Sequence, residues 1–510
     1  MTDFLVVSPP LCTPAEPSSG AFLLSGALKA RGFTAPFLDL SPEFFSFCRE
    51  AMEDDPRREA WRRAEARLRE SKNGFDPVIH RTATGIIHSA LAHSTALPAG
   101  WKATLMDLIP PFDIHSPLLV REMCEKGRDP FSGFWDAALD PVLKETRPET
   151  VLLSLSYLSQ LAGAVSLAFR LERAGVRCIA GGSLPNSLAL TGSGLGVLGR
   201  VLPGLRLGDG GDLAGLPPGR ILEKVVFPDL AGGTGWMSPR MVVPFTLSTG
   251  CCWNRCLFCP DRDAPWSAAP AGALDMFLES VPVESRGSGR PVLHLLDSAL
   301  PPGLLARALP SIRRSGLGFF GFARPTRELL SSCPPKDLAD SGCLMLQLGV
   351  ESGSPSILER FCKGFGPEEA EETLVALAGA GIRTYAYLLF GLPGEEDADR
   401  RDTAALVERA GDSIDFLNLS IFNLPRHCEL SRRAGEFGIE TRPAARNEED
   451  RIALYHEFTW RGETPRAVSR RFIAGAAKTG TALYDAVKRT PRWLRASHMA
   501  MMRLPGRNPP

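Results

Sequence analysis

Short apolar runs alternate with amphipathic helical stretches in two long series along the chain. In the first series the helical patterns 19–32 and 164–175 both end in glycine. Short β-type runs separated by helices with glycine stops are typical of a parallel, doubly wound (Rossmann-like) sheet. The apolar runs of this series are residues 4–7, 36–40, 151–156, 177–183 and 205–211.

The second series has six β-type runs with helical stretches between them, such as 367–381. Six β/α repeats predict a partial (β/α)6 barrel of the TIM type. The expected fold class is therefore α/β, with a doubly wound sheet, then a partial barrel and a helical C-terminal tail. The six runs are residues 243–250, 292–297, 318–324, 344–351, 385–393 and 416–422.

These patterns predict three parts. Residues 1–230 form the doubly wound domain, which a largely helical insertion, 45–145, interrupts. Residues 219–240 carry proline and glycine without a clear period, which indicates a linker, and the barrel covers 240–430. From about 446 we expect a helical, basic extension. It is either a solvated tail or a patch for an anionic partner such as a membrane surface or nucleic acid, and its end, WLRASHMAMMRL, could lie at a membrane interface.

Composition narrows the class of protein. Of 510 residues, 58 are Lys or Arg and 58 are Asp or Glu, so the chain as a whole is no polyanion binder. No basic region precedes the short apolar run near the start, and no stretch of 18 apolar residues occurs, so we expect neither a signal peptide nor a membrane span. Eight of the twelve cysteines are scattered, which favours reduced thiols in a cytoplasmic protein.

The other four cysteines lie within nine residues, 251–259. Cys252, Cys256 and Cys259 have the spacing C-x3-C-x2-C and directly follow a predicted barrel strand, where barrel enzymes place their active sites. Three thiolates can hold three irons of a [4Fe–4S] cluster and leave the fourth iron open for a ligand. A structural zinc site needs four closed ligands, and Cys251 is a poor fourth because neighbours on an extended chain point to opposite faces.

This motif, with Phe258 as its aromatic residue, resembles the signature of radical S-adenosylmethionine (SAM) enzymes. GVESGSPSILERFCKG (349–364), a helix and YLLFGLPGE (387–395) are similar in order and spacing to the branch that includes methylthiotransferases and cobalamin-dependent enzymes. The resemblance covers roughly 240–430. It implies that SAM chelates the open iron and is cleaved reductively to a 5′-deoxyadenosyl radical and methionine.

Each residue that the resemblance places around SAM also has a structural interpretation. Asp297 would meet the SAM amino group or cap a helix, and Arg324 would pair with the SAM carboxylate or form a rim salt bridge. Glu351 would accept hydrogen bonds from ribose or an ammonium group. The remaining SAM candidates are Phe258, Ser352 and the turn glycines Gly391 and Gly394, whose alternative is a plain strand-to-helix turn.

The N-terminal sheet resembles the cobalamin-binding domain that precedes the barrel in cobalamin-dependent radical SAM proteins. SPP (8–10), LSLSYLSQ (153–160), AGGSLP (180–185) and GDGG (208–211) carry this resemblance. No D-x-H-x-x-G is present, so no histidine is offered to cobalt, and a degenerate domain that only packs on the barrel remains the alternative. The expected cobalamin residues are Ser154, Ser156, Gly181, Gly182, Gly208 and Gly210.

The sequence thus predicts a radical SAM enzyme that methylates an unactivated carbon with the help of cobalamin. The alternatives are a radical SAM enzyme without cobalamin, for rearrangement or methylthiolation, and a non-catalytic iron–sulfur or zinc protein. The substrate, whether peptide, lipid, tetrapyrrole or small metabolite, stays open. An electron donor such as flavodoxin or ferredoxin is expected as a partner.

Overall fold

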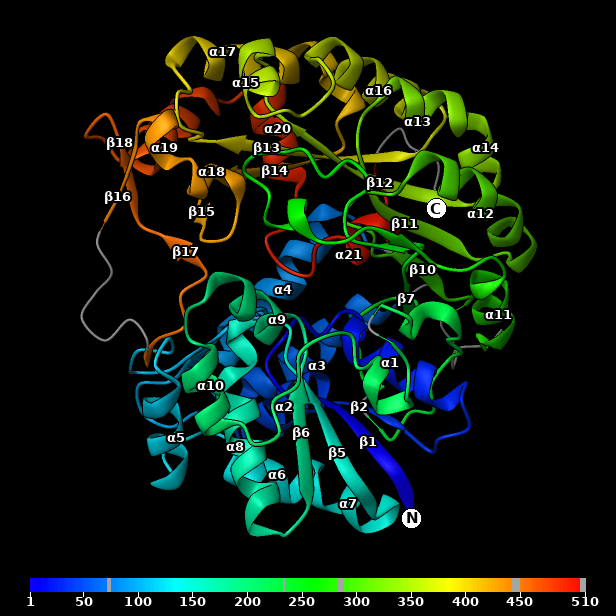
Figure 1. Cartoon of the computed structure of the whole chain (residues 1–510), viewed down its shortest axis with the longest axis vertical. Coiled ribbons are helices and arrows are strands. Elements are labelled where there is room, and N and C mark those ends of the chain that lie inside the picture. Colours follow the sequence, from blue (N-terminus) through cyan, green and yellow to red (C-terminus); the bar gives the residue numbers. More distant parts are fainter. Residues whose placement is uncertain (71–74, 218, 233, 283–288, 443–449, 505–510) are drawn as a thin grey trace. The chain divides into compact units, whose positions relative to one another are not determined.

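The computed structural model describes residues 1–70, 75–217, 219–232, 234–282, 289–442 and 450–504 (Figure 1). The chain forms two compact units. The first contains Met1–Pro244, Pro270–Pro291 and Ala445–Leu454, and the second contains Phe245–Ala269, Val292–Ala444 and Tyr455–Pro510. No helix in the described ranges is long and apolar enough to span a membrane.

A four-stranded parallel sheet lies at the centre of the first unit, in the order β2-β1-β5-β6. The chain leaves β1 toward β2 on one side and later adds β5 and β6 on the other. The carboxyl ends of β1 and β5 therefore flank a topological switch point, where open α/β sheets bind ligands. The elements are β1 (Thr2–Ser8), α1 (Ser19–Lys29), β2 (Phe37–Asp39), β5 (Pro148–Ser154), α8 (Leu161–Arg173), β6 (Arg177–Gly181), α9 (Ser183–Thr191), α10 (Leu195–Val201) and α11 (Ala273–Ser280).

The prediction of a strand at residues 205–211 is wrong. Arg206 donates one backbone hydrogen bond to Ala180, but Gly208 and Gly210 then adopt φ of 104° and 81°. A run that needs left-handed glycines cannot extend along a strand. The segment is a loop that lies beside the end of β6.

The region between β2 and β5 is mostly helical, with one short hairpin. Its helices begin as the sequence indicates: Asp55 and Asp76 each cap a helix by accepting backbone N–H groups, and proline follows each at the first helical position. The elements are α2 (Leu40–Glu50), α3 (Pro56–Arg69), α4 (Pro77–Leu91), β3 (Lys102–Ala103), β4 (Leu108–Ile109), α5 (Pro117–Glu125), α6 (Ser132–Ala138) and α7 (Asp140–Thr146).

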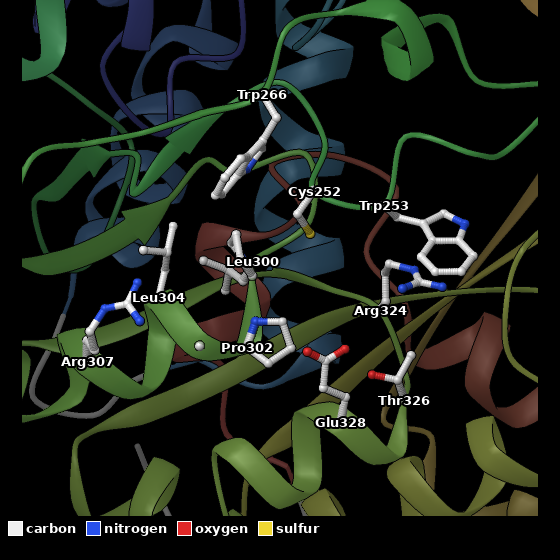
Figure 2. Close-up of a pocket in the computed structure, with 12 residues that line it drawn as sticks. Cys252, Trp253, Trp266, Leu300, Pro302, Leu304, Arg307, Arg324, Thr326 and Glu328 are labelled. Carbon is white, nitrogen blue, oxygen red and sulfur yellow. The ribbon is translucent and has the colours of Figure 1, made fainter.

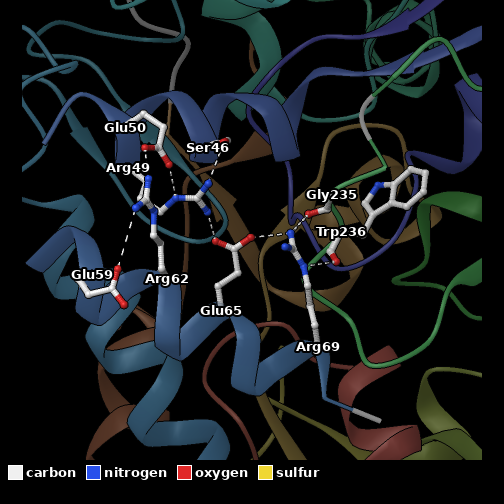
Figure 3. A network of polar contacts seen from close by, with 9 residues as sticks. All are labelled: Ser46, Arg49, Glu50, Glu59, Arg62, Glu65, Arg69, Gly235 and Trp236. Atoms are coloured by element: carbon white, nitrogen blue, oxygen red, sulfur yellow. Dashed lines mark hydrogen bonds and ion pairs between the residues drawn. The ribbon is translucent and has the colours of Figure 1, made fainter. Parts of the chain in front are cut away.

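Arginine–carboxylate contacts join α2 to α3 (Figure 3). Glu65, whose side chain is 6% exposed, lies between Arg49 and Arg69 and pairs with both. Arg69 also donates to the carbonyl oxygens of Gly235 and Trp236. The network therefore fastens residues 235–236 to the helical insertion.

Residues 219–240 were predicted to be a linker, but their described part packs on the first unit. Val225 and Phe227 are buried. Phe37 exchanges backbone hydrogen bonds with Asp229 and Ala231, which extends the sheet edge beyond β2. Apolar side chains in an irregular segment gave no periodic signal, yet their burial holds the segment on the first unit.

The second unit is built on a six-stranded sheet in the order β14-β13-β12-β11-β10-β7, with parallel pairing from β10 to β14. Helices cover its outer face (Figure 1), where Leu346, Leu348, Ala386, Leu388 and Leu417 are buried. The strands are β7 (Val242–Phe245), β10 (Val292–Leu295), β11 (Gly318–Ala323), β12 (Cys343–Glu351), β13 (Arg383–Phe390) and β14 (Phe416–Ile421), and the helices α12 (Pro302–Ser315), α13 (Arg327–Ser332), α14 (Pro335–Asp340), α15 (Pro355–Arg360), α16 (Pro367–Gly379) and α17 (Asp397–Ala410).

The C-terminal region departs from the prediction of a solvated helical tail. Two short strands precede its helices. The segment WLRASHMAMMRL, for which an interfacial helix was one possibility, is largely buried: Met499 and Met502 are fully enclosed, and α21 packs against β12. These elements are α18 (Glu429–Arg432) and the pairs β15 (Leu424–Pro425) with β17 (Tyr455–His456) and β16 (Ile439–Thr441) with β18 (Phe458–Trp460), then α19 (Pro465–Ala476), α20 (Ala482–Arg489) and α21 (Ser497–Met501).

Candidate active site

The cysteine motif lies on a loop that two short antiparallel strands, β8 (Ser248–Thr249) and β9 (Ser267–Ala268), close at its base. Cys252 is exposed, and Cys256 and Cys259 are half-buried. Between them Leu257 is buried; its N–H donates to Phe361 and its carbonyl accepts from Leu430. The loop is thus pinned at its middle residue, while the three thiols remain accessible.

Asp297 holds the base of this loop. Its Oδ2 accepts the Leu247 N–H at 2.9 Å and its Oδ1 accepts the Ser248 hydroxyl at 2.6 Å. Asp297 is 3% exposed, and burial raises its pKa. Both oxygens are used inside the protein, so the geometry supports a role in positioning the cysteine loop rather than direct contact with the SAM amino group.

Arg324 follows β11 and lies next to the cysteine loop (Figure 2). Its guanidinium carbon is 4.0 Å from the centre of the Trp253 ring, and it donates to the Lys363 carbonyl. Its Nε is buried without a hydrogen-bond partner among the described residues. Burial lowers the pKa of Arg324, and the nearby Cys256 and Cys252 thiols oppose that shift. An incoming carboxylate would satisfy the unpaired Nε.

Arg324 also lines a cavity of about 310 Å³ that reaches the first cysteine. Figure 2 shows the Cys252 sulfur, the Arg324 guanidinium and the Glu328 carboxylate around this space. Trp253 and Trp266 lie on the cysteine-loop side. A space of this size beside an accessible thiol and an arginine can admit a small polar ligand.

Glu351 ends β12 at a register shift and adopts a φ of 66°, which is uncommon for a residue other than glycine. Lys363 holds it there: the ammonium Nζ lies 2.9 Å from Glu351 Oε1, and the two side chains are 8% and 15% exposed. Burial alone would lower the pKa of Lys363, but the charge of Glu351, followed by that of Cys256, outweighs it and raises the pKa. A fixed positive charge therefore lies near the cysteines.

Ser352 and the two turn glycines contact other parts of the protein. Ser352 is fully buried and its hydroxyl lies 3.1 Å from that of Thr403. A Cβ on Gly391 would meet Ser469 Oγ of α19 at 3.0 Å, and one on Gly394 would meet Arg360 at 2.2 Å. These glycines make room for α19 and Arg360, so the geometry gives no direct support for their contact with adenine.

Phe258 points into an apolar cluster. Its ring centre lies 6.1 Å from that of Phe361 and 6.5 Å from that of Phe422. Lys363 Nζ lies 5.9 Å from the Phe258 ring centre. The aromatic residue of the motif thus packs the cysteine loop against the end of α15 and the end of β14.

Lys363, Trp253 and Trp266 were not predicted as site residues. Lys363 stands in the run GVESGSPSILERFCKG, but only the fold shows that it pairs with Glu351, twelve positions earlier. Trp253 is held by an indole N–H bond to the Cys362 carbonyl at 2.8 Å. Gly364 packs on the Trp253 ring, since a Cβ there would lie 1.9 Å from it, and this close approach explains the glycine.

The donor set suits an iron–sulfur cluster. Burial raises the pKa of Cys256 and raises that of Cys259 to about 12, so cluster assembly must displace their protons. Arg324 and Lys363 supply positive charge beside the resulting thiolates. Within the described ranges no three His, Cys, Asp or Glu side chains are grouped to hold a single metal ion; a cluster spaces its thiolates more widely than one ion does.

The residues predicted for cobalamin gather at the carboxyl edge of the first sheet. Ser154 and Gly181 are register partners at the ends of β5 and β6, and Ser156 follows in the next loop. Gly208 lies near this edge, since it exchanges two hydrogen bonds with Asn186 of α9. A Cβ on Gly208 would meet nothing within 4 Å.

Two glycines of this set serve the protein itself. Gly182 has a φ of 118°, and a Cβ there would lie 2.3 Å from the Leu155 carbonyl oxygen. A Cβ on Gly210 would lie 2.8 Å from the Leu24 side chain of α1. Substitution at either position would therefore disturb packing in the first unit, whether or not a ligand binds.

Comparison with known proteins identifies the barrel. Residues 334–407 match the radical SAM superfamily. This part of the barrel therefore resembles the radical SAM family. The match includes Glu351, Lys363, Gly391 and Gly394 and begins after the cysteine loop. It confirms the prediction of a radical SAM enzyme, and this family implies a [4Fe–4S] cluster and SAM as cofactors.

The fold of the whole chain is similar to that of two solved structures. One is the radical SAM methyltransferase TsrM from Kitasatospora setae with cobalamin and a [4Fe–4S] cluster (13% identity, 96% of this chain and 91% of that chain, TM-score 0.53). The other is the cobalamin-dependent radical enzyme OxsB with aqua-cobalamin and SAM (13% identity, 94% and 67%, TM-score 0.52). These likenesses confirm the predicted fold class.

An uncharacterized protein of Methanopyrus kandleri is 26% identical over 190 residues, which are 35% of this chain and 35% of that protein. The alignment therefore spans about a third of the relative's length.

Proposed function

We propose that this radical SAM protein cleaves SAM reductively at a [4Fe–4S] cluster bound by Cys252, Cys256 and Cys259, and that it transfers a methyl group from cobalamin to an unactivated carbon. The observation that carries the proposal is the fixed loop with three accessible thiols beside two cations, the half-buried Arg324 and the buried Lys363. When bound, the cluster with SAM supplies one-electron cleavage, and cobalamin supplies a transferable methyl group. The fold shared with TsrM and OxsB supports the cobalamin part.

The chain's own residues have distinct tasks in this proposal. Arg324 offers its unpaired Nε to the SAM carboxylate, and Trp253 covers the guanidinium and limits its access to water. Lys363 orients Glu351 for a ligand hydroxyl or ammonium group. Asp297 and Phe258 fix the loop, Asp297 at its base and Phe258 at its middle.

The first test removes the thiols. A triple Cys→Ala variant at 252, 256 and 259 should lose bound iron, sulfide and visible absorbance after anaerobic reconstitution. Cys251→Ala should keep all three and form 5′-deoxyadenosine upon reduction with dithionite. Iron and sulfide at wild-type stoichiometry in the triple variant would show that other residues bind the cluster.

We further propose that cobalamin lies on the carboxyl edge of the first sheet, without a protein ligand on its lower face. Tyr157 and Leu207 are 61% and 49% exposed at the loops of this edge, and exposed apolar side chains around an open, glycine-rich edge suit a flat macrocycle.

Leu207→Asp tests this site with Leu190→Asp as its matched control, because Leu190 is 64% exposed at the far end of α9. After anaerobic loading with hydroxocobalamin and removal of the excess, wild type and the control should retain near-stoichiometric cobalt. Leu207→Asp should retain several-fold less. Well-folded, cluster-replete wild type that retains no cobalt would favour a radical SAM enzyme that uses SAM alone.

The proposal also covers the class of substrate and the electron donor. TsrM has been solved with tryptophan substrate and a SAM analogue, so a small metabolite is among the substrate classes to test here. A flavodoxin or ferredoxin is the proposed donor, and a cytoplasmic location is the proposed setting.

A further inference from the structure

The barrel strands have an inner face that the surrounding helices do not cover. Residues paired in register on neighbouring strands point to the same face of the sheet, and three such rows make up the inner face. The rows are Phe322–Gln347–Tyr385–Phe416, Gly349–Tyr387–Asn418 and Leu389–Ser420. Phe322, Tyr387 and Asn418 of these rows are half-exposed, whereas Tyr385 and Phe416 are buried. Most residues that alternate with the rows along the strands are buried on the outer face.

The inner face is aromatic and neutral. The Phe322 and Tyr387 rings lie 5.3 Å apart, the Tyr385 and Tyr387 rings lie 4.5 Å apart, and the Tyr387 hydroxyl donates to Gln347 Oε1 at 2.7 Å. No member of the three rows is charged. Aromatic side chains with a few polar groups are typical of small-molecule sites.

The C-terminal segment adds one cation to this face. Arg495 donates from a terminal nitrogen to Asn418 Oδ1 at 2.8 Å and from Nε to the Pro491 carbonyl at 3.1 Å. Burial raises the pKa of Tyr385, and the neighbouring Arg495 guanidinium opposes part of that shift. Arg495 is exposed, and in the described part of the chain no carboxylate pairs with it.

The backbone holds Arg495 in place. Leu494 and Ala496 adopt φ of 49° and 44° on either side of it, and such left-handed conformations are strained for residues with a Cβ. Arg383, at the start of β13, fixes the following helix by donating to the carbonyls of Ala500 at 3.2 Å and Met502 at 2.7 Å. The segment that carries Arg495 is therefore buried and anchored rather than a mobile end.

We infer that Arg495 recognises a carboxylate of the substrate, whose apolar body lies along Phe322 and Tyr387. One guanidinium with neutral amide and hydroxyl neighbours suits a monoanion, and a planar carboxylate matches its paired N–H groups.

This inference rests on the proposed function for its biological meaning, but its test does not need SAM cleavage. Cluster-replete protein without reductant is titrated calorimetrically with 3-phenylpropionate, 4-phenylbutyrate and 5-phenylvalerate and with the matching amides. At least one acid should bind about tenfold or more tightly than its amide, the loss expected for one charged hydrogen-bonding group. Failure of SAM cleavage, measured separately, would refute the proposed function and leave this result standing.

Arg495→Gln should reduce the acid-to-amide ratio to about one, and Arg495→Lys should keep part of it because it retains the charge. Arg492→Gln is the matched control: it removes a charge from the same segment, where Arg492 lies 4.8 Å from the Trp493 ring centre, and it should keep the wild-type ratio. Equal binding of acids and amides by wild type, no binding of any acid, or a ratio that survives in Arg495→Gln would overturn the inference. If Arg495→Gln does not fold, the inference is judged by the acid-to-amide ratios of the wild type and of Arg495→Lys, and ratios of about one in both would overturn it.

Discussion

Replacing Lys363 with methionine removes the cation that holds Glu351, and it keeps a side chain of similar length. The two charged atoms are 2.9 Å apart and both side chains are largely buried. At an effective dielectric constant of about 20, their attraction is about 6 kcal/mol before desolvation is subtracted. Removing one partner of a buried pair typically costs about 3–5 kcal/mol, because the remaining charge is left unpaired.

Part of this loss should appear as weaker SAM binding, since Glu351 would leave its left-handed conformation. We expect the SAM dissociation constant of cluster-replete protein, measured anaerobically by calorimetry, to rise by about 10- to 100-fold, as for the loss of a charged hydrogen bond. Lys336→Met, at an exposed position of α14, should leave the constant unchanged.

A double-mutant cycle shows whether Lys363 acts through Glu351. If it does, Glu351→Gln and the double variant should bind SAM about equally, with a coupling free energy of at least about 1.5 kcal/mol. Strictly additive losses would refute the reasoning, because Lys363 would then contribute by a separate route.

Three further predictions concern the scaffold. Glu65→Ala should lower the free energy of unfolding by about 3 kcal/mol in urea titrations, because the largely buried Arg49 loses its enclosed carboxylate partner and the more exposed Arg69 loses the same contact. The exposed Glu59→Ala should change the free energy of unfolding by less than about 1 kcal/mol. Burial raises the pKa of Glu395 to about 7, above its unfolded value, so its contribution to stability is full at low pH and is lost as pH rises through about 4.5 to 7. This decline should be absent in Glu395→Gln. Gly182→Val should lose the near-ultraviolet circular dichroism of native packing even without cobalamin, because its Cβ would meet Leu155; a native spectrum with cobalt loss alone would show a ligand effect instead.

The amphipathic pattern by itself determined most of the fold. Strands such as β1, β5, β12 and β13 appeared as apolar runs because parallel strands are buried on both faces, and glycine stops marked the ends of their helices. The pattern failed where burial has no period: residues 219–240 are held by scattered apolar side chains, and 205–211 is a glycine turn.

The sequence also predicted which residues carry the chemistry, because C-x3-C-x2-C, GVESGS and GLPGE are local in the chain. Local spacing cannot say what each side chain faces. Only the tertiary structure decided that Asp297 holds the cysteine loop, that Ser352 is enclosed against Thr403 and that Gly391 accommodates α19.

Side-chain contacts between separate elements were the least accessible from sequence. Lys363 pairs with Glu351 because α15 returns the chain to the strand end, and Arg495 reaches Asn418, 77 positions away, because α21 is buried against β12. A basic residue near the C-terminus has the same local signature whether it is solvated or placed on the inner face of a barrel. The packing of distant apolar side chains, which no motif records, decides between the two.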